Sequence, residues 1–368
     1  MTTKSSRAIP EHYDQDDAED AVSSRTTAPG ATAESPWHLP WRAWIQVLKR
    51  VWIMIGFHQI SLLSAGVAFF VFLAITPLIA ATTLIYGLIG DPATVADQMA
   101  RIVEVVPSDA AQLIEEQLIG AVTTSKGVVG LALIIALFFA LFGGMRAANG
   151  MIAALNIINE ERETRGIVSL TLRAASLTLA AIFIAIVGLA SGGVFAWLQT
   201  QTSFLLGGGT AFLFKALTWI AAIALGSAGF ALIMRYGPDR RPAKWRWLTP
   251  GSVLSTLLWI LISFGFSLYV AYISDYNATY GSLSAIVVFL MWLFLSAYGV
   301  LLGALLNAEI ERQIYCDTTI GPDRPAGRRG AVLADMIDAS MPKEEALEKR
   351  RHRQAERARH KADEGEKL

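Results

Sequence analysis

The sequence has little of what a soluble enzyme normally shows. Its 368 residues include one cysteine, Cys316, and five histidines, and charged residues make up only 17% of the chain. A single thiol can form neither an intrachain disulfide nor a metal site built from several cysteines. The 31 basic residues balance the 31 acidic ones. The chain therefore lacks the basic surface that nucleic-acid-binding proteins present, and we expect no specific nucleic-acid partner.

Familiar catalytic motifs are missing as well. The sequence contains no His-Glu-x-x-His helix, no Walker-type phosphate loop and no Gly-x-Ser-x-Gly elbow. Metal-dependent hydrolysis needs several His, Asp or Glu ligands close together, whereas the apolar parts of this chain hold almost no carboxylates. We therefore expect a protein that is not an enzyme and that holds no cofactor and no metal.

The chain is rich in apolar sequence. Hydrophobic residues make up 54% of it, and the mean hydropathy is +0.45. Six continuous runs each approach the ~20 residues that a helix needs to cross a bilayer, and they do not alternate as barrel strands do. The sequence predicts an all-α, polytopic integral membrane bundle of about six transmembrane helices. The runs are Leu62 to Leu88, Val128 to Met145, Leu177 to Trp197, Ala216 to Met234, Val253 to Tyr272 and Ser282 to Leu306.

The loops between these runs differ in positive charge. Basic residues collect before the first run, between the second and third, and between the fourth and fifth, whereas the other loops carry few. Basic loops stay on the cytoplasmic side of a membrane, so the alternation predicts that both termini are cytoplasmic. The residues concerned are Arg42, Lys49, Arg50, Arg146, Arg162, Arg165, Arg173, Arg235, Arg240, Arg241, Lys244 and Arg246.

The remaining segments are amphipathic or polar. Tryptophans between Trp37 and Trp52 predict an amphipathic helix in the cytoplasmic interface, and residues 91–120 show the spacing of two short amphipathic helices on the external face. The N-terminal residues cannot bury enough apolar surface to fold, and the C-terminal residues are highly charged. We therefore expect a disordered cytoplasmic tail (1–36), a six-span membrane domain (37–315) and a charged cytoplasmic C-terminal tail (316–368).

Polar groups within the apolar sequence are the candidates for a site. Pro77 follows Thr76 in the first run, and Asn149, Asn156 and Asn307 carry amides. An amide in a bilayer must find a partner, which either a polar cavity or a neighbouring helix can supply. Lining a cavity and holding helices together are therefore both open for these residues.

The last hairpin carries polar groups at both of its ends. We expect three residues of its outer loop to cap the external face: Tyr276, Asn277 and Tyr280. Glu309 and Glu311 lie at the cytoplasmic end, where coupling to transport is one interpretation. The pattern favours instead a solvated helix end in which the carboxylates pair with Arg312.

Several segments carry a family resemblance. They are the basic loop Arg235–Gly251, the loop Tyr-Asn-Ala-Thr-Tyr-Gly-Ser that begins at Tyr276, and the helix end Leu-Asn-Ala-Glu-Ile-Glu-Arg that ends at Arg312. Here the chain resembles the YihY/BrkB membrane protein family, formerly also labelled ribonuclease BN-like, over roughly residues 51–312. The resemblance implies about six spans in the bacterial inner membrane and a link to serum resistance and cell-envelope integrity.

The glycine-rich spans, the polar groups confined to a few levels and the missing catalytic motifs together favour transport or translocation of an envelope lipid or another amphipathic substrate. Membrane lipids would then be partners, and a homo-oligomer or envelope protein partners are further expectations. The candidate substrate path comprises Thr76, Pro77, Asn149, Asn156, Tyr276, Asn277, Tyr280, Asn307 and Glu309.

Two other functions stay open. A non-catalytic membrane scaffold in envelope integrity or serum resistance is the alternative. A membrane-associated ribonuclease is disfavoured, because a carboxylate such as Asp239, Glu160, Glu161 or Glu163 would have to meet a histidine in space.

Overall fold

The computed structural model describes residues 28–89, 126–205, 208–272, 283–325 and 327–336. Within these ranges the chain is helical, and its one β-type pairing is an isolated bridge between Ala243 and Thr319. The short helices are η1 (Pro36–His38), α2 (Trp41–Phe57) and α12 (Val332–Asp335). The long helices are α3 (Ile60–Ile89), α6 (Lys126–Ile158), α7 (Ile167–Leu205), α8 (Gly208–Tyr236), α9 (Trp245–Tyr272) and α11 (Leu283–Gln313).

The apolar runs lie in the long helices, which confirms the all-α membrane bundle. Five of the described helices are long and apolar enough to cross a membrane, and α2 together with α3 as far as Ile75 forms a sixth candidate, bent by 64°. The helices extend beyond their apolar runs: α6 continues past its run to Ile158, and α7 begins before its run, at Ile167. These extensions carry polar residues, so a hydropathy pattern alone does not predict that the helices continue through them. The predicted external helices at 91–120 fall outside the described residues.

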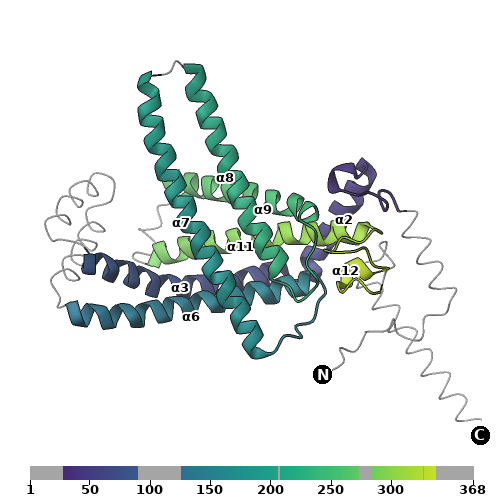
Figure 1. Cartoon of the computed structure of the whole chain (residues 1–368), viewed down its shortest axis with the longest axis horizontal. Helices are drawn as coiled ribbons and strands as arrows, with labels where there is room; N and C mark the ends of the chain where they lie inside the picture. Colours follow the sequence, from purple (N-terminus) through teal and green to yellow (C-terminus); the bar gives the residue numbers. More distant parts are fainter. Residues whose placement is uncertain (1–27, 90–125, 206–207, 273–282, 326, 337–368) are drawn as a thin grey trace, which may run out of the picture.

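The long helices run in two main directions. Figure 1 shows α3, α6 and α11 side by side along the long axis, whereas α7 and α8 form a hairpin that projects steeply away from it. Helix α9 contacts both α8 and α11, and α7 contacts both α6 and α8. The hairpin is therefore joined to the rest of the bundle through α6 on one side and α9 on the other.

Burial is concentrated at one end of the bundle. Three leucines at this end are completely buried: Leu301 and Leu305 of α11 and Leu155 near the end of α6. By contrast, Leu131 and Phe138, nearer the start of α6, are each 64% exposed. Exposed apolar side chains are stable where lipid is the solvent. The tightly packed core thus lies where the loops 159–166 and 237–244 leave the helices, and the part of α6 away from these loops presents apolar surface.

Two glycines allow α9 and α11 to cross at close range. A Cβ atom added to Gly251 would lie 2.0 Å from the carbonyl oxygen of Gly303, and one added to Gly303 would lie 2.1 Å from Ser255 Oγ. Small residues let helix backbones approach each other in membrane proteins, where lipid gives no hydrophobic drive for association. This crossing places the end of α11 against the start of α9.

The helix α2 is amphipathic, as the tryptophan-rich sequence predicts. It buries Val47 and Met54 against the core and exposes Trp41 and Trp52, which are 74% and 80% exposed. At Gln59 the backbone takes a left-handed conformation, with φ of 51°, between α2 and α3. The chain therefore turns sharply before the first long helix.

Parts of both end segments pack onto the bundle. Ala31 is buried, and its carbonyl oxygen accepts a hydrogen bond from the backbone nitrogen of Tyr315 at 2.8 Å. After α11, the backbone of Thr318 accepts a bond from Lys244 N at 2.8 Å. The folded body therefore includes residues 28–36 and 316–336, which the sequence led us to place in the two tails.

The crossing of α9 and α11 can be tested with one methyl group. Gly251→Ala should lower the free energy of unfolding by about 1–3 kcal/mol or more, because the new Cβ atom would overlap the α11 backbone. Thermal unfolding of the protein purified in detergent measures the change. Gly265→Ala on the same helix is the control, since no atom lies within 4 Å of its added Cβ. Equal stability of the two variants would contradict the close crossing.

Candidate functional site

Charged and amide side chains gather at the tightly packed end of the bundle. They come from α2, from the loops 159–166 and 237–244, from the last turns of α11 and from the segment 314–335. We call this group the polar junction. Helix α11 is at its centre, because it contacts α2, α3, α6, α9 and α12.

Two carboxylates of α11 are buried in ion pairs. Glu309 is 2% exposed and accepts a hydrogen bond at 2.8 Å from Arg50 Nε of α2. Glu311 receives both terminal nitrogens of Arg240 at 2.5 Å, together with the hydroxyl of Thr318. The Arg240–Glu311 pair is bidentate, which makes it strong and geometrically specific. For both pairs, the cost of removing the two charges from water is large. Each partner is therefore stable in this place only while the other is present.

The prediction of a solvated helix end at Glu309 and Glu311 is wrong. The expected pairing of Glu309 with Arg312 exists at 3.6 Å, yet all three side chains are buried. The reason is tertiary: α2 and α12 pack against α11, and Arg240 and Thr318 cap Glu311. The final turns of α11 form part of the core.

Glu160 occupies an unusual backbone position just after α6. Its φ is 56°, and the bonds from Glu161 N to Asn156 O and from Glu160 N to Ile157 O close the helix as a Schellman motif. Glycine normally fills this left-handed position, because a side chain there is strained. The Glu160 carboxylate lies 3.7 Å from Arg312 and is 4% exposed. The ion pair accounts for a carboxylate at a position that suits glycine.

Asn156 joins the two loops of the junction. Its Nδ2 donates to Glu163 at 2.9 Å, and its Oδ1 accepts from Asp239 N at 2.7 Å. Asp239 in turn accepts bonds from the backbone nitrogen and hydroxyl of Thr164, and Glu163 receives two nitrogens of Arg165. The amide is 5% exposed. Its observed role is to hold the loops together.

Asn307 joins three long helices. Its Oδ1 accepts from Gly251 N at 2.7 Å, and its Nδ2 donates to Leu248 O at 3.0 Å and to Met234 Sδ at 3.4 Å. These contacts bind α11 to the start of α9 and the end of α8. Both interpretations were open for this amide, and the structure uses it to hold helices together.

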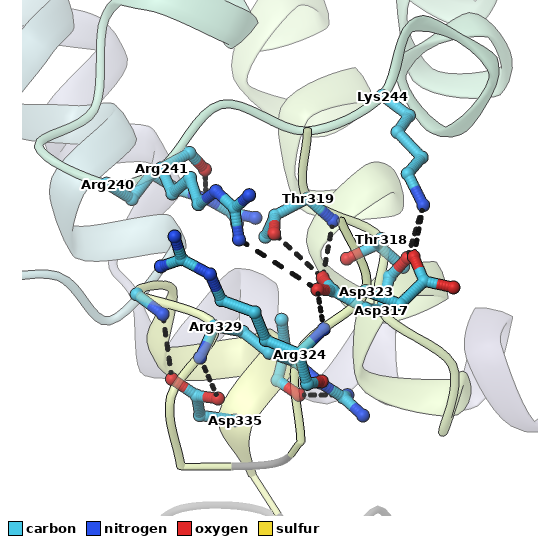
Figure 2. A network of polar contacts seen from close by, with 12 residues as sticks. Arg240, Arg241, Lys244, Asp317, Thr318, Thr319, Asp323, Arg324, Arg329 and Asp335 are labelled. Carbon is cyan, nitrogen blue, oxygen red and sulfur yellow. Dashed lines mark hydrogen bonds and ion pairs between the residues drawn. The ribbon is translucent and has the colours of Figure 1, made fainter. Parts of the chain in front are cut away.

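The segment after α11 folds around its own carboxylates (Figure 2). Asp317 accepts bonds from Thr319 N at 2.8 Å, Thr319 Oγ1 at 2.7 Å and Arg324 N at 2.9 Å, with Arg241 4.0 Å away. Burial alone would raise the pKa of Asp317, but the Thr319 and Arg324 bonds outweigh it and lower the pKa. Asp335 likewise accepts from the nitrogens of residues 327, 329 and 330. The segment is thereby fixed on the junction.

Glu161 is a carboxylate of the junction whose pKa is raised. Its Oε1 accepts a hydrogen bond from Val332 N at 2.7 Å, which links the loop 159–166 to α12. Burial raises its pKa from 4.5 to about 7, and the nearby charges of Glu311 and Asp239 add to the rise. The Val332 bond and Arg240 act in the opposite direction without cancelling it.

The other predicted path residues lie elsewhere. Asn149 is half-buried in α6, and its Oδ1 has no hydrogen-bond partner among the described residues. Pro77 lies within α3, which continues to Ile89, and Thr76 precedes it there. The predicted caps fall outside the described residues: Tyr276, Asn277 and Tyr280.

A shallow, open hollow, which we call the groove, lies along the first turns of α7, next to the polar junction, and this helix and Gly166 form its lining. Its volume is about 680 Å³. Ile167, Val168 and Leu172 expose 85%, 74% and 64% of their surface there, and Arg173 is exposed beside them. The residues that line it are Gly166, Ile167, Val168, Ser169, Leu172, Arg173 and Ser176. The groove thus brings one cationic group and two hydroxyls together with a large apolar surface.

Sequence reasoning missed the ionic role of several residues. Arg50 and Arg240 contributed to the loop charge that sets topology, and this explanation left no reason to seek partners for them. One signal was available for Arg50: it lies at helical spacing on the face of α2 that also carries Val47 and Met54. Among the described residues, no group of three or more His, Cys, Asp or Glu side chains forms a candidate metal site.

The comparison with known families agrees with this architecture. The profile described as virulence factor BrkB matches residues 52–328. The chain belongs to this family. The matched region begins within α2 and ends in the segment after α11, so it includes every long helix and most of the polar junction. No solved structure matches the chain.

Two relatives show how far the similarity extends. The putative ribonuclease-like protein YfkH of Bacillus subtilis is 28% identical over 269 residues, which are 72% of this BrkB-family chain and 95% of the relative. A UPF0761 membrane protein of Rhodospirillum centenum is 30% identical over 303 residues, which are 79% of this chain and 62% of that protein. The chain thus spans less than two thirds of the second relative.

The pair between Arg240 and Glu311 should dominate the stability of the junction. Glu311→Gln leaves the guanidinium buried without its counter-charge, so the free energy of unfolding should fall by about 3–5 kcal/mol. Asp323→Asn is the control, because Asp323 is 79% exposed in its pair with Lys244 and surface pairs contribute about 0–1 kcal/mol. Denaturant unfolding in detergent measures both. A loss below about 1 kcal/mol for Glu311→Gln would contradict a buried pair.

Glu161 should make stability depend on pH. An acid whose pKa is raised by folding stabilises the fold below its unfolded pKa, and that contribution is lost as pH rises through the folded pKa. Between pH 4.5 and about 7 the wild type should lose up to about 3 kcal/mol relative to Glu161→Gln, since one pKa unit corresponds to about 1.4 kcal/mol. Thermal unfolding of both proteins across this range measures the difference.

A neighbouring carboxylate provides the control with the opposite sign. The hydrogen bonds from Arg165 lower the pKa of Glu163, so its contribution is lost as pH falls. Glu163→Gln should therefore change the pH profile in the other direction. The same pH profile for wild type and Glu161→Gln would show that Glu161 titrates normally.

Proposed function

We propose that this BrkB-family protein is a non-enzymatic carrier that moves a lipid or another amphipathic molecule between the leaflets of the bacterial inner membrane. The observation that carries the proposal is the groove at the start of α7. A phospholipid has a charged headgroup and apolar chains, and the groove offers Arg173, Ser169 and Ser176 beside exposed Ile167 and Leu172. Its position at the end of an apolar helix corresponds to the depth of lipid headgroups.

The distribution of packing supports the same function. The polar junction is tightly packed, whereas the parts of α6 and α7 away from it expose large apolar side chains such as Phe138 and Phe183. The α7–α8 hairpin projects away from α3, α6 and α11, as Figure 1 shows. Lipid chains would have access to these exposed faces.

The orientation in this proposal follows from charge. The junction contains the basic loop 237–244, and basic loops stay in the cytoplasm. Both termini would then be cytoplasmic, and Trp41 and Trp52 of α2 would lie at the cytoplasmic interface, where indole rings are enriched. The groove would open at the level of the inner leaflet.

The carboxylates that a ribonuclease would need have other partners. Asp239 accepts bonds from Thr164, Glu163 binds Arg165, and Glu161 accepts from the backbone of α12. These contacts stabilise the loops. The name of the Bacillus subtilis relative contains the words ribonuclease-like, but we propose the carrier function because the groove fits an amphipathic molecule.

Lipid movement in vesicles tests the proposal. Wild-type protein in phospholipid vesicles should move fluorescent phospholipids to the outer leaflet, where dithionite quenches them, faster than empty vesicles do. Arg173→Ala should slow this movement several-fold, because it removes the cationic group of the groove. Arg162→Ala is the matched control, since Arg162 is an exposed arginine outside the groove.

The outcomes separate the candidate functions. Loss of movement in Arg173→Ala with retention in Arg162→Ala, at equal thermal stability, would support the carrier. No movement by wild type across neutral and anionic lipids would overturn it and favour the membrane scaffold. Asn307→Leu is unsuitable here, because Asn307 holds α8, α9 and α11 together.

A further inference from the structure

A small enclosed cavity lies within the polar junction, where α8, α9 and α11 meet. Its volume is about 20 Å³, which is enough for one particle of the size of a water molecule. Arg235 at the end of α8, Trp247 at the start of α9 and Glu311 of α11 are among the residues around it. The cavity is separate from the open groove at the start of α7.

The unsatisfied polar atoms around this cavity are hydrogen-bond donors. Arg235 Nε and Trp247 Nε1 are buried, and neither has a partner among the described residues. Their residues are 8% and 3% exposed. A buried N–H group without an acceptor destabilises the folded state. Both residues line the cavity, so an acceptor held there is the natural partner for these donors.

The side-chain acceptors around the cavity are already engaged. The oxygens of Glu311 receive Arg240 and Thr318, and Asn307 Oδ1 receives Gly251 N. Asn159 Oδ1 receives Arg240 at 3.0 Å. The protein therefore supplies donors, and the occupant has to supply the acceptor.

The charges around the cavity do not balance. Arg240 is neutralised by Glu311, but the described contacts of Arg235 are with neutral groups. Its Nη1 donates to Ala243 O at 2.6 Å, and its guanidinium lies 4.5 Å from the centre of the Trp245 ring. A buried guanidinium is costly without a counter-charge. The site therefore favours an occupant that is negatively charged.

We propose that the cavity binds a chloride ion, held by Arg235 Nε and Trp247 Nε1. Chloride is only slightly larger than water, accepts hydrogen bonds from several directions and carries the missing charge. A water molecule would satisfy the donors but leave the charge of Arg235 unbalanced. A carboxylate or phosphate ligand is too large for this volume. The ion would tie the start of α9 to the end of α8.

Anion exchange on the intact protein tests the site. Wild-type protein in detergent is transferred to sodium gluconate, and chloride is added at constant ionic strength and pH while the thermal midpoint is measured. Chloride should raise the midpoint by several degrees in a saturable way, because an ion that binds the folded state stabilises it. Bromide should act similarly, and sulfate should not.

Two tryptophan variants locate the effect. Trp247→Phe removes one donor, so its midpoint should lose the chloride dependence. Trp245→Phe is the matched control: Trp245 stacks on Arg235 but does not line the cavity, so the chloride dependence should remain. Equal chloride responses in wild type and Trp247→Phe would overturn the assignment.

Wild-type protein alone also decides the question. Crystals grown in bromide should show an anomalous scattering peak between Arg235 and Trp247. The absence of that peak, or identical midpoints in chloride and gluconate, would show that the cavity holds water only. Neither measurement depends on whether the lipid carrier proposal is correct, or on whether Trp247→Phe folds.

Discussion

Arg240 donates two hydrogen bonds to Glu311 in a site that water barely reaches, and much of the junction is arranged around that pair. Arg240 comes from the loop between α8 and α9, while Thr318 comes from the segment after α11. Neither charge could stay buried without the other. The pair thereby holds the loop between α8 and α9 and the C-terminal segment in fixed positions against α11. These contacts set how far apart the long helices lie at this end of the bundle.

The spans could be predicted from the sequence because lipid is a uniform solvent. A run such as Val128–Met145 must be helical wherever it lies in the bilayer, so local composition is sufficient. Where a helix ends depends instead on its tertiary contacts. Residues 146–158 continue α6 because they pack against α3, α7 and the junction, and hydropathy contains no information about those contacts.

The polar site was only partly predictable for a related reason. Asn156 and Asn307 were recognised as unusual, since polar groups next to apolar runs need partners, whereas Glu309 was expected at a solvated helix end. Their partners could not be inferred, because Arg50 and Glu309 are 259 residues apart and no local pattern relates them. The basic residues also had a sufficient explanation in membrane topology. One arginine can serve both purposes, as Arg240 does by lying in a basic loop and neutralising a buried carboxylate.

The distance along the chain between Arg50 and Glu309 also has a consequence for biogenesis. Ribosomes add about 5–20 residues per second, so Arg50 is made roughly 13–50 s before its carboxylate, 259 residues later. During that interval Arg50, on the buried face of α2, has no carboxylate partner, because α11 has not yet been made. The amphipathic surface of α2, with Trp41 and Trp52, would retain it at the bilayer surface meanwhile. The last helix to be inserted is thus the one that completes the core.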